Sequence, residues 1–479
     1  MEMIGLFTIL VPFLGAILTL LVPKTSAKWV CQLFAALATL GTWALAYHFF
    51  LQGGEAQSVA IVQFGHLLIF GLTVDKVSTL IAAAVVGLGL IVAIYSLGYM
   101  STGNKEHPHE GDPRYYSFLL VFIGAMAGLV LSSTLVGQLL FFEITGACSW
   151  SLIGYYQTPI AFRSALKALI VTHIASLGLF IAAATLFIQT GTFELTAIAT
   201  LTPSAKMIVL FGILFAAWGK SAQLPMHMWL PDAMNAPTPV SAYLHAASMV
   251  KVGVYIFARG ILSAGDVPIE VGVVGVIGAM ITMIYGFVMY LPQKDMKRLL
   301  AYSTITQLAY IFLALSMAAM GSSLALKAGV SYIFNHAFAK SLFFFVAGSL
   351  SFACGTRMLP QLRGIITKSP LLGVGFCVAA MAIAGVPPFN GFFSKFPLLE
   401  AGFQLSAEHS WLTPVLVLAL IESVATFGWL LYWFGKSVVG KPSEEVENIS
   451  PLPASMKSML VVLIAMSVLS SFIASAWLN

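Results

Sequence analysis

Four lysines lie inside hydrophobic segments that are long enough to cross a membrane: Lys220, Lys251, Lys340 and Lys395. A lysine at the centre of a bilayer costs about 2.5 to 3.5 kcal/mol on translocon insertion scales. Ionisable side chains at that depth usually face a bundle interior or a water-filled cavity and mark the path of an ion. The four lysines therefore predict a route for protons or other cations.

Further ionisable residues share this apolar setting: Glu143, Glu422, His173, His245 and His336. A single lysine in a span can also be structural, because its side chain can reach the interface or form an ion pair. So many ionisable residues on different spans favour an ion path instead. Burial disfavours the charged forms of lysine and glutamate alike, so protons can be handed from one group to the next.

Prolines interrupt two of the lysine-bearing segments. In FAAWGKSAQLPMHMWLP, Lys220 precedes Pro225 by five residues, and in GVPPFNGFFSKFPLLEAG, Lys395 lies between Pro387–Pro388 and Pro397. Proline removes a helix hydrogen bond. A helix broken at membrane depth offers free carbonyls and half-helix dipole ends to an ion. The sequence therefore predicts two broken helices, each carrying one lysine.

The elements that position these residues are predicted to be membrane spans. The chain is 59% hydrophobic and only 9% charged, whereas a soluble protein carries about 25% charged residues. A span needs about 20 mainly apolar residues. The chain is therefore predicted to be an all-α polytopic membrane protein, a single membrane domain over residues 1–479. About fourteen spans are expected, at roughly 4–22, 29–51, 77–99, 115–132, 134–156, 166–189, 207–230, 240–262, 270–291, 299–319, 327–351, 372–400, 411–434 and 456–477.

The two broken helices, seventh and twelfth in this order, suggest an internal repeat. Their offset of five spans is odd and reverses orientation, so spans 4–8 and 9–13 are expected to form two inverted five-helix repeats. The predicted divisions of the chain are 1–114 (three N-terminal helices), 115–262 (first repeat), 263–434 (second repeat) and 435–479 (the last helix).

The basic residues orient the chain. With the first loop placed in the cytoplasm, the inner loops hold 15 of the 23 Lys and Arg residues and the outer loops and helix ends only 4. This asymmetry follows the positive-inside rule and predicts that both termini lie outside, on the periplasmic side. The first apolar segment lacks a basic n-region and a small-residue cleavage site, so we expect a retained span.

Two other classes of protein are disfavoured. The basic residues are spread through short loops without interleaved aromatic residues, so no nucleic-acid partner is predicted. The cysteines are isolated and form no CxxC or Cys/His cluster, so we expect no metal site and no redox cofactor in this chain; they are Cys31, Cys148, Cys354 and Cys377.

Several stretches together resemble the antiporter-like membrane subunits shared by respiratory complex I, the multi-subunit sodium/proton (Mrp) antiporters and the membrane-bound hydrogenases. They run from the fifth to the twelfth predicted span: LLFFEITGACSW, GKSAQLPMHMWLPDAMNAPTPVSAYLHAASMVKVGVY, DMKRLLAYSTITQLAY, NHAFAKSLFFFVAG and GVPPFNGFFSKF. The resemblance implies a non-catalytic subunit that moves ions within a multi-subunit oxidoreductase complex of the cell membrane.

The resemblance also implies individual roles. Glu143 and Lys220 match the family's glutamate–lysine pair, which opens and closes and thereby changes the pKa of the lysine. Lys251 matches a lysine of the eighth helix. His336 and Lys340 match the central connecting pair. The implied proton pathway consists of Glu143, Lys220, His245, Lys251, His336, Lys340 and, towards the exit, Lys395. The chain departs from some members at His173 and Ser176, where a charged Arg and Asp can appear, which puts coupling through the sixth helix in doubt.

The sequence of one longer stretch, YYSFLLVFIGAMAGLVLSSTLVGQLLFFEITG, more specifically resembles component D of hydrogenase-4 type formate hydrogenlyase. That resemblance implies partners: other antiporter-like and anchor membrane subunits, and peripheral nickel–iron hydrogenase and iron–sulfur subunits, with formate dehydrogenase as a further candidate. The expected location is the bacterial inner membrane. The alternatives are a subunit of a stand-alone sodium/proton antiporter, which would use the same residues, and a structural scaffold. The residues leave proton and sodium open as the transported ion.

Overall fold

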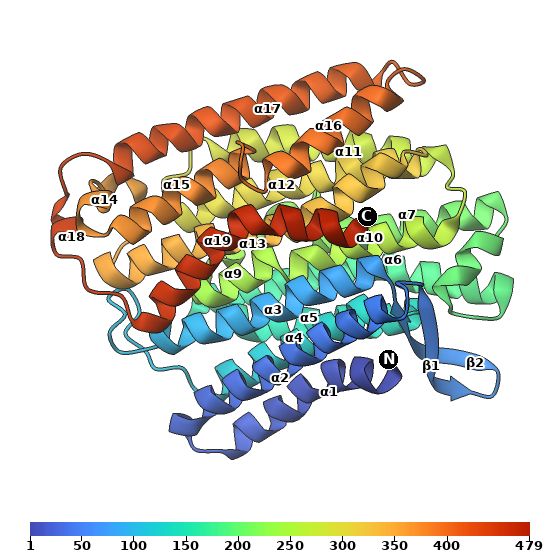
Figure 1. Cartoon of the computed structure of the whole chain (residues 1–479), viewed down its shortest axis with the longest axis horizontal. Coiled ribbons are helices and arrows are strands. Elements are labelled where there is room, and N and C mark those ends of the chain that lie inside the picture. Colours follow the sequence, from blue (N-terminus) through green and yellow to red (C-terminus); the bar gives the residue numbers. More distant parts are fainter.

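Long helices lying side by side make up most of the protein (Figure 1). The computed structural model describes all 479 residues. The long helices are α1 (Glu2–Leu21), α2 (Lys24–Leu51), α3 (Lys76–Tyr99), α4 (Pro113–Leu131), α5 (Leu135–Ile153), α6 (Pro159–Thr190), α7 (Pro203–Lys220), α11 (Ile269–Tyr290), α12 (Met296–Ala319), α13 (Ser323–Cys354), α17 (Leu412–Trp433) and α19 (Ala454–Leu478). The shorter elements are η1 (Leu195–Thr200), η2 (Met226–Met228), α8 (Trp229–Asp232), η3 (Ala233–Asn235), α9 (Thr238–Ala246), α10 (Met249–Ala264), η4 (Leu359–Gln361), α14 (Ile365–Lys368), α15 (Pro370–Ala384), α16 (Phe392–Leu405), the π-helical η5 (Phe434–Val438) and α18 (Glu444–Glu447).

The number of membrane spans agrees with the sequence analysis. Thirteen helices are long and apolar enough to cross a membrane, with α9 and α10 together forming one of them. The remaining expected span, at 372–400, is divided between α15 and α16. The predicted class of multi-pass helical membrane protein is therefore confirmed. The inverted symmetry of the two repeats and the division of the chain into four segments stay predictions.

Local sequence sets where several helices begin. Asp112, Thr158 and Thr202 each stand before a proline, and each side chain accepts a hydrogen bond from a backbone N–H in the first turn. This arrangement satisfies one free N–H of the helix end, and proline is tolerated at the first helical position because its nitrogen needs no partner there. The starts of α4, α6 and α7 are thus encoded in two adjacent residues each.

Both predicted helix breaks are present, and a third was not expected. Helix α7 ends at Lys220 and only short turns follow, while residues 385–391 separate α15 from α16. The third break, at Ala247 and Ser248, separates α9 from α10 within what the sequence indicated as one continuous eighth helix. The Ser248 hydroxyl donates to the carbonyl of Tyr243 across this break, at 2.9 Å.

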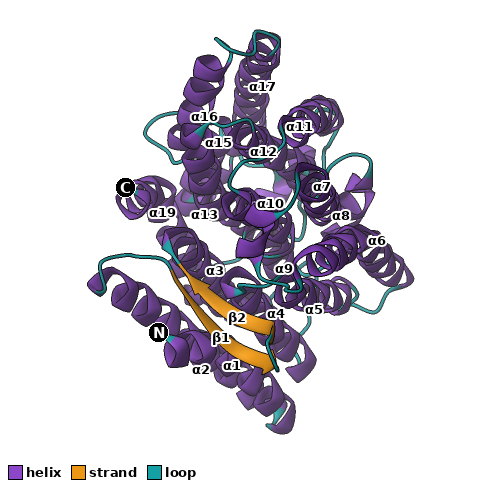
Figure 2. Cartoon of the chain, turned by 90° about the vertical axis from the view of Figure 1, so that its right-hand side faces the viewer, coloured by secondary structure: helices purple, strands orange, loops and turns teal.

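Polar helices occupy the centre of the bundle. Over an 18-residue stretch, every residue of α9–α10 and of α12 is buried and nearly every residue of α13, whereas fewer than half of the residues are buried in α1, α2, α17 and α19. In the view along the helices, α10, α12 and α13 lie in the middle and α1, α2, α6 and α17 on the periphery (Figure 2). The central helices therefore have protein neighbours on all sides.

A β-hairpin covers one end of the bundle (Figure 2). The sequence indicated a loop at 52–74, but β1 (Gln57–Phe64) and β2 (Leu67–Val74) pair antiparallel there. Both chain termini lie at this end, since Gly5 packs against Leu72 and Lys76 Nζ donates to the carbonyl of Asn479 at 3.0 Å. Figure 1 shows the opposite end occupied by α14 and α18.

A buried ion pair joins the hairpin end to the centre of the bundle. Arg259, on α10 two turns after Lys251, contacts Asp75 through both terminal nitrogens, at 2.5 and 3.1 Å. Burial alone would raise the pKa of the Asp75 carboxyl, but the Arg259 guanidinium and the N–H of Ser78 outweigh it and hold this pKa below its ordinary value. The pair ties α10 to the residue before α3 at the hairpin end of the bundle.

We predict that Asp75→Asn lowers the free energy of unfolding by about 3 kcal/mol, because Arg259 is then buried without a counter-charge. Thermal unfolding of the purified chain in detergent measures this loss. Since the pKa of Asp75 is lowered by folding, its contribution is fully present above about pH 4 and is lost as the pH falls through the folded value. The double variant Asp75→Asn/Arg259→Leu should recover part of the stability. A double variant less stable than either single one would contradict this account.

Candidate functional site

Lys220 ends α7 at the first helix break and is buried, with 1% of its surface exposed. Its ammonium donates to the carbonyl of Phe142 on α5 at 2.8 Å and lies 4.1 Å from the centre of the Phe142 ring. Gly146 lies beside this ammonium, and a Cβ there would be in ordinary van der Waals contact with Nζ, at 3.4 Å. A carbonyl and an aromatic face thus hold this cation.

The expected partner of Lys220 is engaged elsewhere. Glu143 lies next to Phe142 on α5, yet its Oε2 contacts Nδ1 of His173 on α6 at 3.1 Å. The second oxygen, Oε1, is buried and has no hydrogen-bond partner within the chain. The structure therefore brings Glu143 and Lys220 onto neighbouring positions without closing an ion pair between them. The carboxylate of Glu143 instead contacts His173. This histidine is one of the positions at which the chain departs from some members of the family that it resembles.

The residues predicted for the central part of the pathway lie on three helices, α9, α10 and α13. On either side of the break in the eighth span, α9 carries His245 and α10 carries Lys251, and Nζ of Lys251 lies 2.9 Å from Nδ1 of His336 on α13. One turn further along α13, Lys340 donates to the Ser303 hydroxyl of α12 at 2.8 Å. Neither ring nitrogen of His245, nor Nε2 of His336, has a hydrogen-bond partner within the chain. The four predicted central residues are thus all buried together.

Lys395 lies on α16, just after the break that separates this helix from α15. Its ammonium contacts the Ser423 hydroxyl at 3.0 Å and the carbonyl of Ala384, the last residue of α15, at 3.4 Å. Gly385 allows this turn, because its φ of +87° suits glycine and a Cβ would come within 2.9 Å of the lysine side chain. The break predicted from the prolines thus supplies an oxygen to the lysine it was expected to serve.

A tyrosine connects Lys395 to the nearest acid. The Lys395 ammonium lies 4.6 Å from the ring centre of Tyr310, and the Tyr310 hydroxyl lies 2.5 Å from Oε2 of Glu422. Thr426 donates to the other carboxylate oxygen of Glu422 at 2.5 Å. Glu422 was singled out in the sequence by its depth in a span, but nothing in the sequence placed Tyr310 between the two charges.

None of the four lysines predicted within spans, all of them buried, forms an ion pair within the chain. The helices that carry them pack in succession, α5 and α7 on α10, α10 on α13, and α13 on α16, and Figure 2 shows this row crossing the bundle. Each ammonium rests on a neutral partner, which compensates a buried charge less well than a carboxylate would. Groups held in this way can gain or lose a proton when a neighbouring charge changes.

Lys297, at the start of α12 beside Arg298, is buried. Its ammonium donates to the carbonyl of Ala236 at 2.7 Å, whereas Arg298 is exposed. Asp232, which follows the break in the seventh span, pairs with Lys167 at 2.8 Å and lies away from the buried row. No group of three or more His, Cys, Asp or Glu side chains lies close enough together to hold a metal ion.

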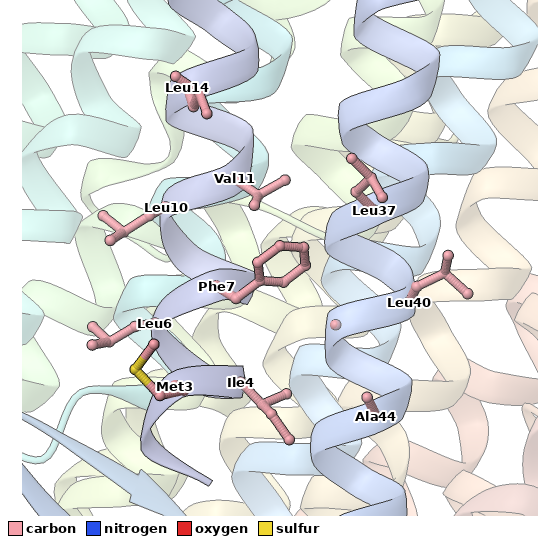
Figure 3. Close-up of a pocket in the computed structure, with 11 residues that line it drawn as sticks. Met3, Ile4, Leu6, Phe7, Leu10, Val11, Leu14, Leu37, Leu40 and Ala44 are labelled. Carbon is pink, nitrogen blue, oxygen red and sulfur yellow. The ribbon is translucent and has the colours of Figure 1, made fainter.

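An apolar groove of about 750 Å³ lies between α1 and α2, two helices that carry none of the buried lysines. In Figure 3, Phe7 and Val11 point from α1 towards α2, whereas Leu6 and Leu10 point away from it. Its lining consists almost wholly of aliphatic and aromatic side chains, many of them exposed. This groove is part of the apolar outer surface that a membrane covers, and it offers no group able to carry a proton.

Comparison with known families gives two matches. The family described as NADH:quinone oxidoreductase/Mrp antiporter, TM, matches residues 132–422, and that described as NADH-Ubiquinone oxidoreductase (complex I), chain 5 N-terminus, matches residues 63–119. The first match covers more than half of the chain. It includes Glu143, Glu422 and the four buried lysines of the predicted pathway that lie between them in the sequence.

Individual proteins agree with this assignment. The chain is 31% identical over 471 residues to NADH-quinone oxidoreductase subunit L of Campylobacter jejuni, covering 97% of this chain and 76% of that one. It is 36% identical over 390 residues to one component of a probable K(+)/H(+) antiporter of Rhizobium meliloti, covering 79% and 38%. The chain spans about half the length of further curated relatives, 49% to 52%.

The fold has a close match among solved structures. A chain of the Mrp complex from Dietzia sp. superposes with a TM-score of 0.87 at 20% identity, covering 99% of this chain and 96% of that one. Family match, curated relatives and fold agree. The protein described here therefore belongs to the family of NADH:quinone oxidoreductase and Mrp antiporter membrane subunits.

Proposed function

We propose that the chain carries protons across the bacterial inner membrane as the antiporter-like subunit of a multi-subunit complex. The observation that carries this proposal is the row of four buried lysines without ion pairs, on successive helices, with three helix breaks beside them. A scaffold would have no need of these groups, since each buried ammonium opposes membrane insertion and folding.

The proposed route has three steps. Protons load from the cytoplasmic side as Lys220 changes its partner between Glu143 and the Phe142 carbonyl. They then pass through Lys251, His336, His245 and Lys340 in the centre. They leave to the outside by Lys395. The separation of Glu143 from Lys220 corresponds to the open state of their pair, with His173 holding the carboxylate.

A partner must supply the energy. Moving one charge against 100 mV costs about 2.3 kcal/mol. We propose that the partner is a peripheral arm with nickel–iron hydrogenase and iron–sulfur subunits, in a complex of the hydrogenase-4 type, to which formate dehydrogenase adds the electron donor. The second candidate is a sodium/proton antiporter subunit driven by an ion gradient. The chain is similar to components of both an oxidoreductase and an antiporter, so these similarities favour neither candidate over the other.

Replacing Lys220 or Lys395 by alanine is predicted to reduce proton translocation at least tenfold, corresponding to about 1.4 kcal/mol of added barrier. Each change removes a carrier that has no second lysine beside it to take its place. Dye-detected acidification of inverted membrane vesicles containing the whole complex measures the rate. The control is Lys327→Ala, which removes an exposed lysine. Normal translocation in both test variants would exclude the proposed route.

Purification of the tagged chain from native membranes, followed by mass spectrometry, separates the two candidate functions. We expect nickel–iron hydrogenase and iron–sulfur subunits to accompany it. Small antiporter subunits without any redox protein would instead establish the gradient-driven exchanger. A chain that purifies alone would contradict both forms of the proposal, because each requires a partner.

The predicted orientation is tested by labelling single cysteines with a membrane-impermeant maleimide in intact spheroplasts. A cysteine placed at either terminus is expected to react without permeabilisation, and one placed at Lys441 only after it. The four native cysteines are first replaced by serine. Reaction at Lys441 in intact cells, with protected termini, would reverse the orientation.

A further inference from the structure

A polar cavity of about 580 Å³ opens at the end of the bundle opposite the hairpin. It lies between the inner end of α6, the turns after the break in the seventh span, and the loops before α12 and after α13. Its charged lining residues are Arg163, Lys167, Asp232, Asp295, Arg298 and Arg357. No step of the proposed route uses these side chains.

Two of the four basic residues already have acidic partners. Lys167 Nζ contacts Asp232 at 2.8 Å, and Arg357 contacts Asp295 at 2.8 Å and Glu106 at 3.0 Å.

The other two, Arg163 and Arg298, have no carboxylate partner in the chain. Four cations and two carboxylates line the cavity, and Glu106, which contacts Arg357, adds a third carboxylate, so the balance is an excess of one positive charge. Such a cavity repels a cation, so it makes a poor entrance for protons, and it attracts an anion.

The cavity continues into an apolar stripe along α6. Ile160 lines the cavity and is 67% exposed. From Arg163 and Lys167, further exposed residues follow at every third or fourth position on the same side of the helix: Ile170, Ile174, Leu177 and Ile181. This spacing keeps them on one face of a helix. A molecule with an anionic head in the cavity would therefore find an apolar track for its tail.

We propose that this cavity binds the phosphate head group of an anionic phospholipid, whose acyl chains lie along the exposed face of α6. Guanidinium groups pair with phosphate oxygens in a bidentate manner, which suits Arg163 and Arg298. Basic pockets between membrane helices on the cytoplasmic side bind such head groups. A zwitterionic lipid carries its own ammonium and gains less from these two arginines. The inference does not depend on proton transport.

Native mass spectrometry of the full chain, delipidated and titrated with phosphatidylglycerol or phosphatidylcholine, tests the proposal. The double variant Arg163→Gln/Arg298→Gln is expected to lose about thirtyfold in affinity for phosphatidylglycerol. The control Lys24→Gln/Lys441→Gln removes two exposed charges outside the cavity and should leave that affinity unchanged. The charge-conserving variant Arg163→Lys/Arg298→Lys should bind phosphatidylglycerol more tightly than the glutamine variant and less tightly than the unmodified chain, because lysine keeps the charge but loses the bidentate contact. Its binding shows that the fold tolerates changes there.

Three results would overturn the proposal. Equal affinity for the two lipids would mean that the two arginines select nothing. Equal loss in the test and control variants would mean a general surface effect. Displacement of the lipid by millimolar inorganic phosphate, with no preference for a lipid tail, would assign the cavity to free phosphate. Preferential retention of phosphatidylglycerol that only the cavity variant loses would support a lipid site.

Discussion

The four lysines of the predicted pathway must be stabilised by neutral groups, because no carboxylate pairs with their buried ammonium groups. The rest of the structure depends on this constraint. Lys220 rests on a backbone carbonyl and an aromatic ring, Lys340 on a hydroxyl, and Lys395 on a hydroxyl and a carbonyl. For Lys220 the oxygen is that of Phe142, within the unbroken helix α5. For Lys395 it is that of Ala384, which ends α15 at a helix break, where carbonyls lack helix partners. One break thus supplies an oxygen to its lysine directly, and the positive φ of Gly385 allows the turn.

The backbone freed at the α7 break is satisfied by the chain itself. A broken helix would otherwise leave polar backbone groups without partners at membrane depth. Around this break, Trp229 donates to the carbonyl of Gly219 at 3.0 Å and Gln223 to that of Ser221 at 3.0 Å. Ser221 in turn donates to the carbonyl of Val250 on α10 at 2.7 Å. Side chains of the chain thus replace the lost helix bonds.

Much of this architecture could be predicted from the sequence, and the exceptions have physical causes. Spans were recognised from apolar length, and two breaks from prolines. The break at Ser248 was missed because no proline marks it: a side-chain bond across small residues replaces the helix bonds there. The hairpin was missed although QSVAIVQF has β-forming residues, because each of its strands is far too short to stand out by apolar length.

For the candidate site, depth in a span agrees with the burial of the four lysines, His245, His336 and Glu422. It fails for His173, whose side chain is 61% exposed, and it did not identify the partners of these residues. Lys297 and Arg298 are adjacent, yet about 100° apart around a helix, so one is buried and the other exposed. The choice of Glu143 between Lys220 and His173 depends on side-chain rotation between three helices. No periodicity in the sequence contains that information.

The geometry also distinguishes the steps of the proposed route. Lys251 and His336 lie 2.9 Å apart, so the proton between their nitrogens can belong to either without movement of heavy atoms. Lys340 and Lys395 have no such shared bond, since each is held by its own hydroxyl. A proton passing between them needs water or side-chain rotation. Because like charges repel strongly in a medium of low dielectric, a proton on Lys340 also opposes a second on its neighbours. Transfer through the centre is therefore expected to be fast and singly occupied, with control at Lys220 and Lys395, the two lysines closest to an acid that can release them.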